Sequence, residues 1–353
     1  MTTRTDIRIS LPSKGRMAEE AMAFLADCGL EVKLLNPRQY AARIPALPEL
    51  TVLFQRPSDI VTSVGDGSVD LGVTGMDIVA ERGAVHSGAV DCAAAAADHG
   101  VLIIHDALRF GQCRLALAVP EDWDGVETVA DLARFARTLP HPLRVATKFP
   151  RLTGEFLTEA GIPFVLIDAE GTLEVAPAIG YADAIADLVS SGQTLRDNRL
   201  RPLADGAILK SQAVLIANRS ALRERREVLT IAGELLESIE AHLRAVDHVA
   251  IYANVRGGSP EEIAGQLFAQ ETLGGLQGPT ISRVVARDGS PNWYAVHIVV
   301  RRAEIFQAVA ELRAIGGSGV VVTPVTYIFE EEPARYRAMM DAVRGAARDG
   351  AQS

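Results

Sequence analysis

The sequence is poor in cysteine, and its cysteines are not placed as in a disulfide framework or a zinc site. Cys28, Cys92 and Cys113 lie far apart, are odd in number and include no Cys-x-x-Cys pair. Disulfide scaffolds and structural zinc sites depend on paired cysteines at short, regular spacings. The pattern therefore favours buried thiols that behave as small apolar side chains.

Lysine is also scarce, and acidic residues outnumber basic ones. The only lysines are Lys14, Lys33, Lys148 and Lys210, and the formal net charge is −10. Nucleic acid requires an extended basic surface, so this balance argues against a nucleic-acid partner. A small phosphorylated ligand needs only a local cluster of donors and stays compatible with the sequence.

Long hydrophobic runs are absent as well. No uncharged apolar run reaches the length of about 20 residues that a membrane span needs, and the start of the chain has no apolar core of the signal-peptide kind. The sequence therefore predicts neither a membrane partner nor secretion. We expect a cytoplasmic protein.

The composition that remains is that of a globular protein with several cores. Hydrophobic residues make up 48% of the chain and charged residues 23%, a typical globular balance. A chain of 353 residues exceeds one ordinary hydrophobic core, so we expect two or three domains.

Strand and helix patterns alternate over the first two thirds of the chain, which predicts α/β units with a largely parallel sheet. Pro57-Ser58-Asp59 is expected to cap a helix. The predicted strands of this region are Ile7 to Leu11, Glu31 to Leu35, Leu50 to Phe54, Asp70 to Thr74, Val101 to Ile104, Cys113 to Val119, Arg144 to Thr147, Phe164 to Asp168 and Ala213 to Ala217. The predicted helices are Met17 to Cys28, Ile60 to Asp66, Val129 to Arg137, Arg151 to Ala160 and Ala182 to Val189.

The last third has a rhythm of its own. A long amphipathic helix from Leu222 to Ala245 is expected to bridge to it, and a charged tail from Glu330 to Ser353 is expected to form a surface helix with a frayed end. Between them the order βαββαβ predicts a ferredoxin-like module. Its expected elements are His248 to Val255, Pro260 to Gln270, Ser282 to Val285, Trp293 to Val300, Ala303 to Ile315 and Gly319 to Pro324.

One stretch has the composition of a phosphate site. The turn Ser190-Ser191-Gly192-Gln193-Thr194 offers three hydroxyls and backbone N–H groups that glycine lets a ligand approach. Asp183 and Asp187 precede it and are four residues apart, so on the predicted helix they share one face. Such carboxylates could accept from ribose hydroxyls or hold Mg²⁺. The alternative is a polar turn without a ligand, since turns of this composition are common.

The run from Asp183 to Leu195 resembles the phosphoribosyl-pyrophosphate (PRPP) signature of the ATP phosphoribosyltransferase family. Other similar runs agree in order and spacing, and together they cover most of the chain before the bridging helix. They are Leu11-Pro-Ser-Lys-Gly-Arg-Met17, Arg56-Pro-Ser-Asp-Ile60, Asp70-Leu-Gly-Val-Thr-Gly-Met-Asp77, Gly111-Gln-Cys-Arg-Leu-Ala-Leu-Ala-Val119 and Arg144-Val-Ala-Thr-Lys-Phe-Pro150.

The resemblance implies roles for individual residues. PRPP would be held by Asp183, Asp187, Ser190, Ser191, Gly192, Gln193 and Thr194. ATP or the pyrophosphate would contact Lys14, Arg16, Arg56, Asp77 and Lys148. The implied reaction is attack of adenine N1 of ATP on C1 of PRPP with release of pyrophosphate, the first step of histidine biosynthesis. It needs no side-chain nucleophile, and Mg²⁺ would be carried mainly by the substrate phosphates rather than by a protein metal site.

The C-terminal module resembles the regulatory domain of the long form of this family, which binds histidine as a feedback inhibitor. The similar runs are Leu276-Gln-Gly-Pro-Thr280-Ile-Ser, Trp293-Tyr-Ala-Val-His297 and Ala314-Ile-Gly-Gly-Ser-Gly-Val320. By position, histidine would contact Asn254, Leu276, Thr280, Val299 and Gly319. Asn254 departs from the acid that relatives often carry in this strand, and an amide cannot pair ionically with an α-ammonium group. The alternative is an assembly module without a ligand.

The implied fold is α/β, with a two-lobed catalytic core like that of type II periplasmic binding proteins and a ferredoxin-like (βαββαβ) regulatory domain. We expect lobe I over residues 1–108 and 198–220, lobe II over 109–197, a connecting helix over 221–245, the regulatory domain over 246–330 and the tail over 331–353. A homo-oligomer, dimer or hexamer, is also expected. The alternatives are an anion- or solute-binding protein and a catalytically silent regulatory paralogue.

Overall fold

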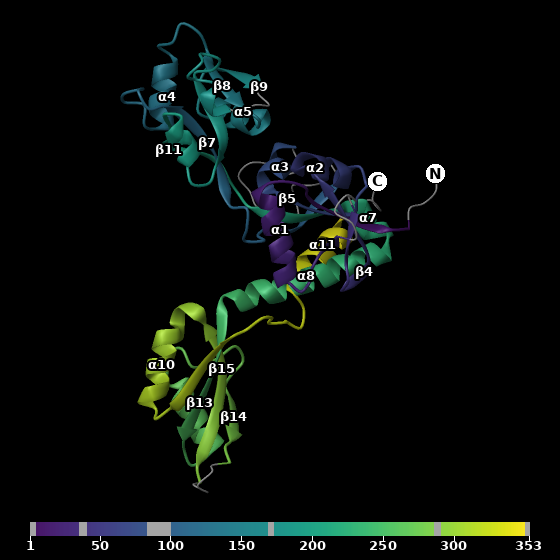
Figure 1. Cartoon of the computed structure of the whole chain (residues 1–353), viewed down its shortest axis with the longest axis vertical. Helices are drawn as coiled ribbons and strands as arrows, with labels where there is room; N and C mark the ends of the chain where they lie inside the picture. The colour runs from purple at the N-terminus through teal and green to yellow at the C-terminus, as the bar shows by residue number, and fades with distance from the viewer. Residues whose placement is uncertain (1–4, 35–40, 83–99, 169–172, 286–290, 350–353) are drawn as a thin grey trace. The chain divides into compact units, whose positions relative to one another are not determined.

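The computed structural model describes residues 5–34, 41–82, 100–168, 173–285 and 291–349 (Figure 1). The chain divides into two compact units, one formed by Met1–Leu236 with Ala334–Ser353 and the other by Glu237–Pro333. The described part of the chain has no helix with the length and apolarity needed to cross a membrane.

The first unit contains two sheets, and the first of these has seven strands in the order β2-β3-β4-β1-β5-β12-β6. Strand β1 pairs in parallel with β4 and β5, whereas β12 is antiparallel to both β5 and β6. Every residue of β5 and β12 is buried, as expected for central strands with apolar runs. The strands are β1 (Ile7–Pro12), β2 (Lys33–Leu34), β3 (Ala41–Ile44), β4 (Leu47–Gln55), β5 (Leu71–Gly75), β6 (Val101–His105) and β12 (Ala213–Asn218), and the helices are α1 (Arg16–Asp27), α2 (Pro57–Gly65) and α3 (Met76–Glu81).

The second sheet of this unit has five strands in the order β11-β7-β10-β8-β9. Two strands, β7 and β11, lead directly from the first sheet into it and pair with each other in antiparallel fashion. The elements are β7 (Cys113–Pro120), α4 (Val129–Ala136), β8 (Leu143–Thr147), α5 (Pro150–Glu159), β9 (Phe164–Asp168), the 3₁₀ helix Leu173–Val175, β10 (Ala184–Val189), α6 (Gln193–Asp197) and β11 (Leu200–Ser211). Strand β11 was not predicted, and it shows that only β12 returns to the first sheet, not residues 198–220 as a whole.

The predicted helix from Ala182 to Val189 is wrong, because these residues form the central strand β10. It pairs with β7 on one side and β8 on the other. Ala184, Ile185 and Ala186 are fully buried, so side chains on both faces of the strand meet core. An alanine-rich apolar run fits a buried helix or a buried strand, and here the tertiary context decides.

Two other details of the first unit differ from prediction. The predicted long helix is divided into α7 (Arg219–Glu224) and α8 (Arg226–Val246), because Arg225 has an extended backbone with φ −117° and ψ 101°. Its guanidinium Nη1 donates to Oδ1 of the buried Asp70 at 2.7 Å. Helix α2 has Arg56 as its N-cap and no side-chain cap, and it begins at Pro57. The helix therefore starts three residues before the predicted Ile60, and residues 57–59 lie in its first turn.

The predicted helix in the tail is present, and it packs on the first unit. Helix α11 (Ala334–Asp349) buries Met339, and Arg335 donates from Nε and Nη2 to Oδ1 of Asp106 at 2.9 and 2.7 Å. The Tyr336 ring lies so close to α8 that a Cβ at Gly233 would meet it at 2.9 Å. Figure 1 shows α8 and α11 side by side.

The second unit has the predicted ferredoxin-like order. Its sheet runs β14-β15-β13-β16 with every pairing antiparallel. Both helices pack their apolar side chains, including Ile263 and Leu312, onto one face of the sheet. The elements are β13 (His248–Arg256), α9 (Pro260–Phe268), β14 (Thr280–Arg283), β15 (Trp293–Arg301), the 3₁₀ helix Arg302–Glu304, α10 (Ile305–Ala314) and β16 (Ser318–Pro324).

Candidate functional site

The Ser190–Thr194 turn lies directly after β10 and is open to solvent. Gly192 has a left-handed backbone with φ 72°, a conformation that glycine adopts without strain. Ser190, Ser191 and Thr194 are exposed. The Gln193 amide donates to Ser191 Oγ at 3.3 Å, whereas within the described residues the amides of Ser191, Gly192 and Thr194 have no protein partner. Several donors are therefore available to an anion from one side.

Asp187 lies on β10, three residues before that turn. Its neighbour Ala186 is in register with Thr147 at the end of β8, which brings Lys148 next to Asp187. Burial raises the pKa of the Asp187 carboxyl; the Leu188 amide and Lys148 oppose this shift, and Glu174 adds to it. The sheet thus places two carboxylates and one ammonium group at the edge where the turn begins.

Asp183 does not belong to this group. It lies just before β10, at the opposite end of the strand, about 13 Å along the chain from Asp187 at the usual rise per residue. Its Oδ2 accepts from the Arg144 backbone N–H at 2.8 Å, and its Oδ1 accepts from Arg144 Nη2 at 2.7 Å. Burial is the largest single effect and raises the pKa of the Asp183 carboxyl, but the hydrogen bonds from Arg144 and the charges of Arg144 and His141 together lower it below its usual value. We therefore assign Asp183 a structural role.

Three predicted basic residues follow neighbouring strands of the first sheet. Lys14 and Arg16 come after β1, and Arg56 comes after β4. The strand ends are aligned, since Pro12 is in register with Gln55. Because ligands bind outside the carboxyl ends of parallel strands, these exposed side chains form a second candidate group.

Asp77 follows β5 at the same edge but is buried, with an exposed fraction of 3%. Its Oδ1 accepts from the Ser211 hydroxyl at 2.5 Å, and the Asp77 backbone N–H donates to Ser211 Oγ at 3.0 Å. Burial raises the pKa of Asp77, and these hydrogen bonds lower it. Asp77 is therefore buried beside the end of β11, and its contact with a ligand in the cleft stays a prediction.

Further side chains lie close together where β7 begins and β11 ends. Cys113 at the start of β7 is in register with Ser211 at the end of β11. Burial raises the pKa of the Cys113 thiol, Asp77 adds to the effect, and Ser211 and Arg16 oppose it. A thiol with a raised pKa stays protonated near neutral pH and is a poor nucleophile. Cys113 is half-buried, Cys28 is buried as predicted, and Cys92 lies outside the described residues.

The five residues predicted to bind histidine do not all lie close together within this chain. Asn254 on β13 is in register with Ser318 on β16, and Gly319 follows with φ 58°. Thr280 lies on β14, at the opposite edge of the sheet from β16. This places Thr280 about three strand spacings, or ~14 Å, from Gly319. Val299 on β15 is half-buried, and Leu276 lies exposed before β14.

These residues lie on or beside the sheet face that the two helices leave open. Tyr252 stacks on His297 with ring centroids 4.4 Å apart, and the Arg256 guanidinium lies 4.5 Å from the centre of the Trp293 ring. The cross-strand registers place these pairs in line with Asn254 and Ala295. This face offers both stacking surfaces and polar groups.

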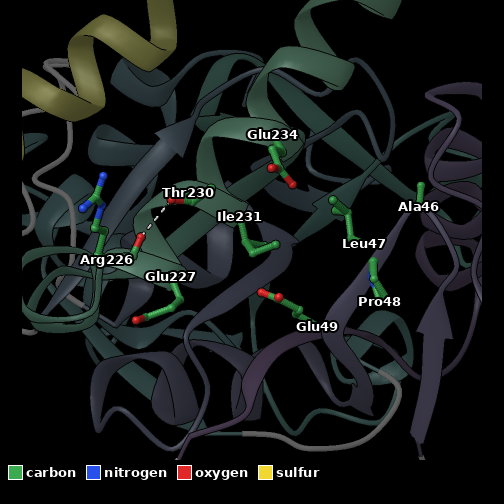
Figure 2. A pocket seen from close by; sticks show the side chains of 9 residues that line it. All are labelled: Ala46, Leu47, Pro48, Glu49, Arg226, Glu227, Thr230, Ile231 and Glu234. Atoms are coloured by element: carbon green, nitrogen blue, oxygen red, sulfur yellow. Dashed lines mark hydrogen bonds between the residues drawn. The ribbon is translucent and has the colours of Figure 1, made fainter.

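A separate hollow of about 520 Å³ lies between β4 and α8 in the first unit (Figure 2). Glu49, Glu227 and Glu234 line it, against one arginine, Arg226. The Thr230 hydroxyl is already bonded to the Arg226 carbonyl at 3.0 Å. An excess of carboxylates repels phosphate, so this hollow is unsuited to the ligands predicted above.

Sequence reasoning missed three polar residues of these sites. Glu174 is the first residue of the stretch that ends in the Ser190–Thr194 turn, and this position could have indicated that it belongs to the site. Ser211 had no such signal, because its partner Asp77 lies 134 residues away along the chain. For Glu20 the four-residue spacing from Arg16 was a signal, but its contact with Gly111, 91 residues away, was not predictable.

Comparisons with known proteins agree on one family. A family model described as ATP phosphoribosyltransferase matches residues 56–241, and one described as HisG, C-terminal domain matches residues 245–327. ATP phosphoribosyltransferase 2, chloroplastic, of Arabidopsis thaliana is 46% identical over 96% of this chain and 80% of its own length. ATP phosphoribosyltransferase of Gemmatimonas aurantiaca is 36% identical over 90% of this chain and 98% of its own.

Among solved structures, a chain of the ATP phosphoribosyl transferase (HisG:HisZ) complex from Thermotoga maritima is similar with a TM-score of 0.48 and 24% identity. The match covers 66% of this chain and 98% of that one. A periplasmic transporter structure matches 68% of this chain and 83% of its own with a TM-score of 0.41 and 11% identity.

Proposed function

The chain belongs to the ATP phosphoribosyltransferase family, pentosyltransferases of histidine biosynthesis, and from this premise we propose which of its residues bind the substrates. PRPP binds with its 5′-phosphate in the Ser190–Thr194 turn. The observation that carries this proposal is the exposed left-handed bend at Gly192, with free amides and hydroxyls beside Asp187. A phosphate monoester needs this convergence of donors.

Asp187 and Lys148 bind the remainder of PRPP in this proposal. Asp187 accepts from the ribose hydroxyls, and Lys148 binds the pyrophosphate as a point charge. Lys14, Arg16 and Arg56 bind the phosphates of ATP or the leaving pyrophosphate from the first sheet. The proposal requires these two groups of residues to approach each other when both substrates are bound.

The chemistry asks the protein for positioning and charge. Adenine N1 forms a bond to C1 of the ribose while the bond from C1 to the pyrophosphate oxygen breaks. Positive charge develops on the ribose and negative charge on the leaving group, so a carboxylate near the ribose and cations near the pyrophosphate both stabilise the transition state. No side-chain nucleophile takes part.

Mg²⁺ is the proposed metal, and the residues present fit it. Magnesium commonly takes one or two protein carboxylates together with substrate phosphates, and Glu174 is near enough to Asp187 to raise the pKa of the Asp187 carboxyl. When bound, Mg²⁺ neutralises charge on the pyrophosphate. The described residues contain no cluster of three or more His, Cys, Asp or Glu side chains able to hold a metal.

One assay tests the activity. Incubation with ATP, PRPP and Mg²⁺ is expected to produce an N1-substituted adenine nucleotide, followed by its ultraviolet absorbance. Omission of PRPP is the control. If no product forms, the chain is instead a solute-binding protein or a silent paralogue, and binding of PRPP measured by calorimetry would separate those two.

Histidine is the proposed effector of the second unit, bound at the open sheet face. Asn254 and Gly319 form the more compact of the two groups of predicted contacts, with Ser318 in register with Asn254, so we place the amino acid there. Asn254 offers an amide oxygen to the α-ammonium group instead of a carboxylate. Affinity is therefore expected to be lower than with an acid at this position, because the ionic contribution is missing.

Histidine at millimolar concentration is expected to inhibit turnover, and Asn254→Asp is expected to strengthen inhibition by about tenfold, the usual difference between a neutral and a charge-assisted hydrogen bond. Thr280→Val is the comparison for the other group of contacts. Undiminished turnover of the unaltered protein at millimolar histidine would reject the effector. Inhibition lost in Thr280→Val but unchanged in Asn254→Asp would move the site to β14.

A homo-oligomer, dimer or hexamer, and a cytoplasmic location stay predictions from the sequence. The Arabidopsis relative is named as chloroplastic, so the location of relatives varies. Light scattering on the purified protein measures the number of subunits directly.

A further inference from the structure

The first connection between the two sheets, residues 106–112, is bound tightly to the first sheet. The Leu108 amide donates to the Ala213 carbonyl at 3.1 Å, and the Ala213 amide donates to the Phe110 carbonyl at 2.9 Å. The Arg109 amide donates to Gln212 Oε1 at 3.2 Å. Arg109 and Gly111 are both left-handed, with φ 62° and 64°, so the backbone turns sharply before β7 begins.

Glu20 of α1 accepts a hydrogen bond from the backbone of this connection. Its Oε2 accepts from the Gly111 N–H at 3.0 Å, and its Oε1 lies 3.3 Å from Arg16 Nε. One carboxylate therefore joins a backbone amide of the connection to a side chain that follows β1. Glu20 and Arg16 are one helical turn apart, a spacing at which such side chains meet.

The position of Arg16 makes this contact relevant to substrate binding. Its side chain is 58% exposed, and in the described part of the chain its Nη1 and Nη2 have no hydrogen-bond partner. Arg16 and Glu20 line a hollow of about 480 Å³ with Arg109, Phe110 and Gln112. Because Glu20 engages Nε alone, the outer two nitrogens stay directed away from it and available to a phosphate.

We propose that Glu20 is a positioning residue, which orients the Arg16 guanidinium for the phosphates of ATP and ties it to the connection at Gly111. This inference rests on the proposed role of Arg16. Loss of Glu20 frees Arg16 without removing its charge.

Glu20→Gln is the informative variant, because the amide oxygen still accepts from Gly111 while the ionic contact with Arg16 is lost. We expect KM for ATP to rise about fivefold, the upper range for a partly exposed ion pair, with KM for PRPP unchanged. Glu20→Ala is expected to raise KM for ATP further and to speed hydrogen exchange in the peptide that contains Gly111, whereas Glu20→Gln leaves that exchange slow. Glu19→Gln, one residue away and exposed, is the matched control.

The double variant Arg16→Ala with Glu20→Gln separates the possible outcomes. If Glu20 acts through Arg16, adding Glu20→Gln to Arg16→Ala has no further effect. An undiminished effect in that background, or a normal KM for ATP in Glu20→Gln while Arg16→Ala is impaired, overturns the role of Glu20 alone. A normal KM for ATP in Arg16→Ala overturns the proposed role of Arg16 and this inference together, while the PRPP site stays intact.

Discussion

Asp187→Ala is expected to weaken PRPP binding by about 10- to 100-fold, the range for losing hydrogen bonds to a charged group, while Asp183→Ala leaves PRPP affinity within about twofold. The two aspartates are alike in sequence context, but only Asp187 lies at the edge where the Ser190–Thr194 turn begins. Calorimetry with PRPP and KM for PRPP measure the effect.

For stability, measured by thermal unfolding, we expect Asp183→Ala to have the larger effect of the two variants. Asp183→Ala removes the partner of the Arg144 guanidinium and of a backbone amide, so we expect a loss of about 1–3 kcal/mol in the free energy of unfolding. Asp187→Ala removes a half-buried carboxylate and is expected not to destabilise the fold. Equal loss of PRPP affinity in both variants would show that Asp183 also binds PRPP, and would contradict a purely structural role for this residue.

The raised pKa of Asp187 gives these expectations a pH dependence. Its folded pKa lies above the unfolded value of about 3.9, so ionising Asp187 costs stability, and this cost is absent below the unfolded pKa and complete above the folded one. Asp187→Asn removes the cost, and its stability relative to the unaltered protein should increase as pH rises through that window. PRPP binding to the unaltered protein should weaken as pH falls through the same window, because the carboxylate is lost.

Gly192→Val is expected to reduce PRPP affinity by about 100-fold, because a side chain there obstructs the approach of a phosphate to the neighbouring amides and disturbs their directions. A Cβ at Gly192 would lie 3.2 Å from Arg196 Nη1 and 3.7 Å from Val189 Cγ1. The backbone conformation adds a strain of about 1–2 kcal/mol for any residue with a Cβ.

Gly180→Val is the matched control for that strain. Gly180 has the same φ of 72°, and a Cβ there meets nothing within 4 Å. Both variants should therefore lose stability from backbone strain, but only Gly192→Val should lose PRPP affinity. Similar PRPP affinity in the two variants would show that the phosphate binds elsewhere.

The composition of the Ser190–Thr194 turn predicted a phosphate site from the sequence, because its hydroxyls and its glycine offer several donors to one anion. The secondary structure before the turn was predicted wrongly, since the apolar run at Ala184 to Val189 has no periodicity that separates a buried helix from a buried strand. That error alone placed Asp183 beside Asp187. On a strand the same four-residue spacing puts them at opposite ends.

Contacts between distant segments could not be predicted from one sequence. Asp77 is buried and bonded to Ser211, and nothing near either residue indicates this bond. The break at Arg225 likewise depends on the buried Asp70, which is 155 residues away. In contrast, the βαββαβ order of the second unit was predicted correctly, because each of its elements is bounded by local turn signals.

The way α11 returns to the first unit makes residues 237–333 an insertion rather than an appendage. The chain leaves through α8 and comes back through α11, and the contact of Tyr336 with Gly233 shows that the points of departure and return are neighbours. The module could therefore be excised and replaced by a short loop without stretching the remaining polypeptide. Two segments, α8 and α11, join it to the rest of the chain, and near the start of α11 Arg335 binds Asp106, where the first connection between the sheets begins.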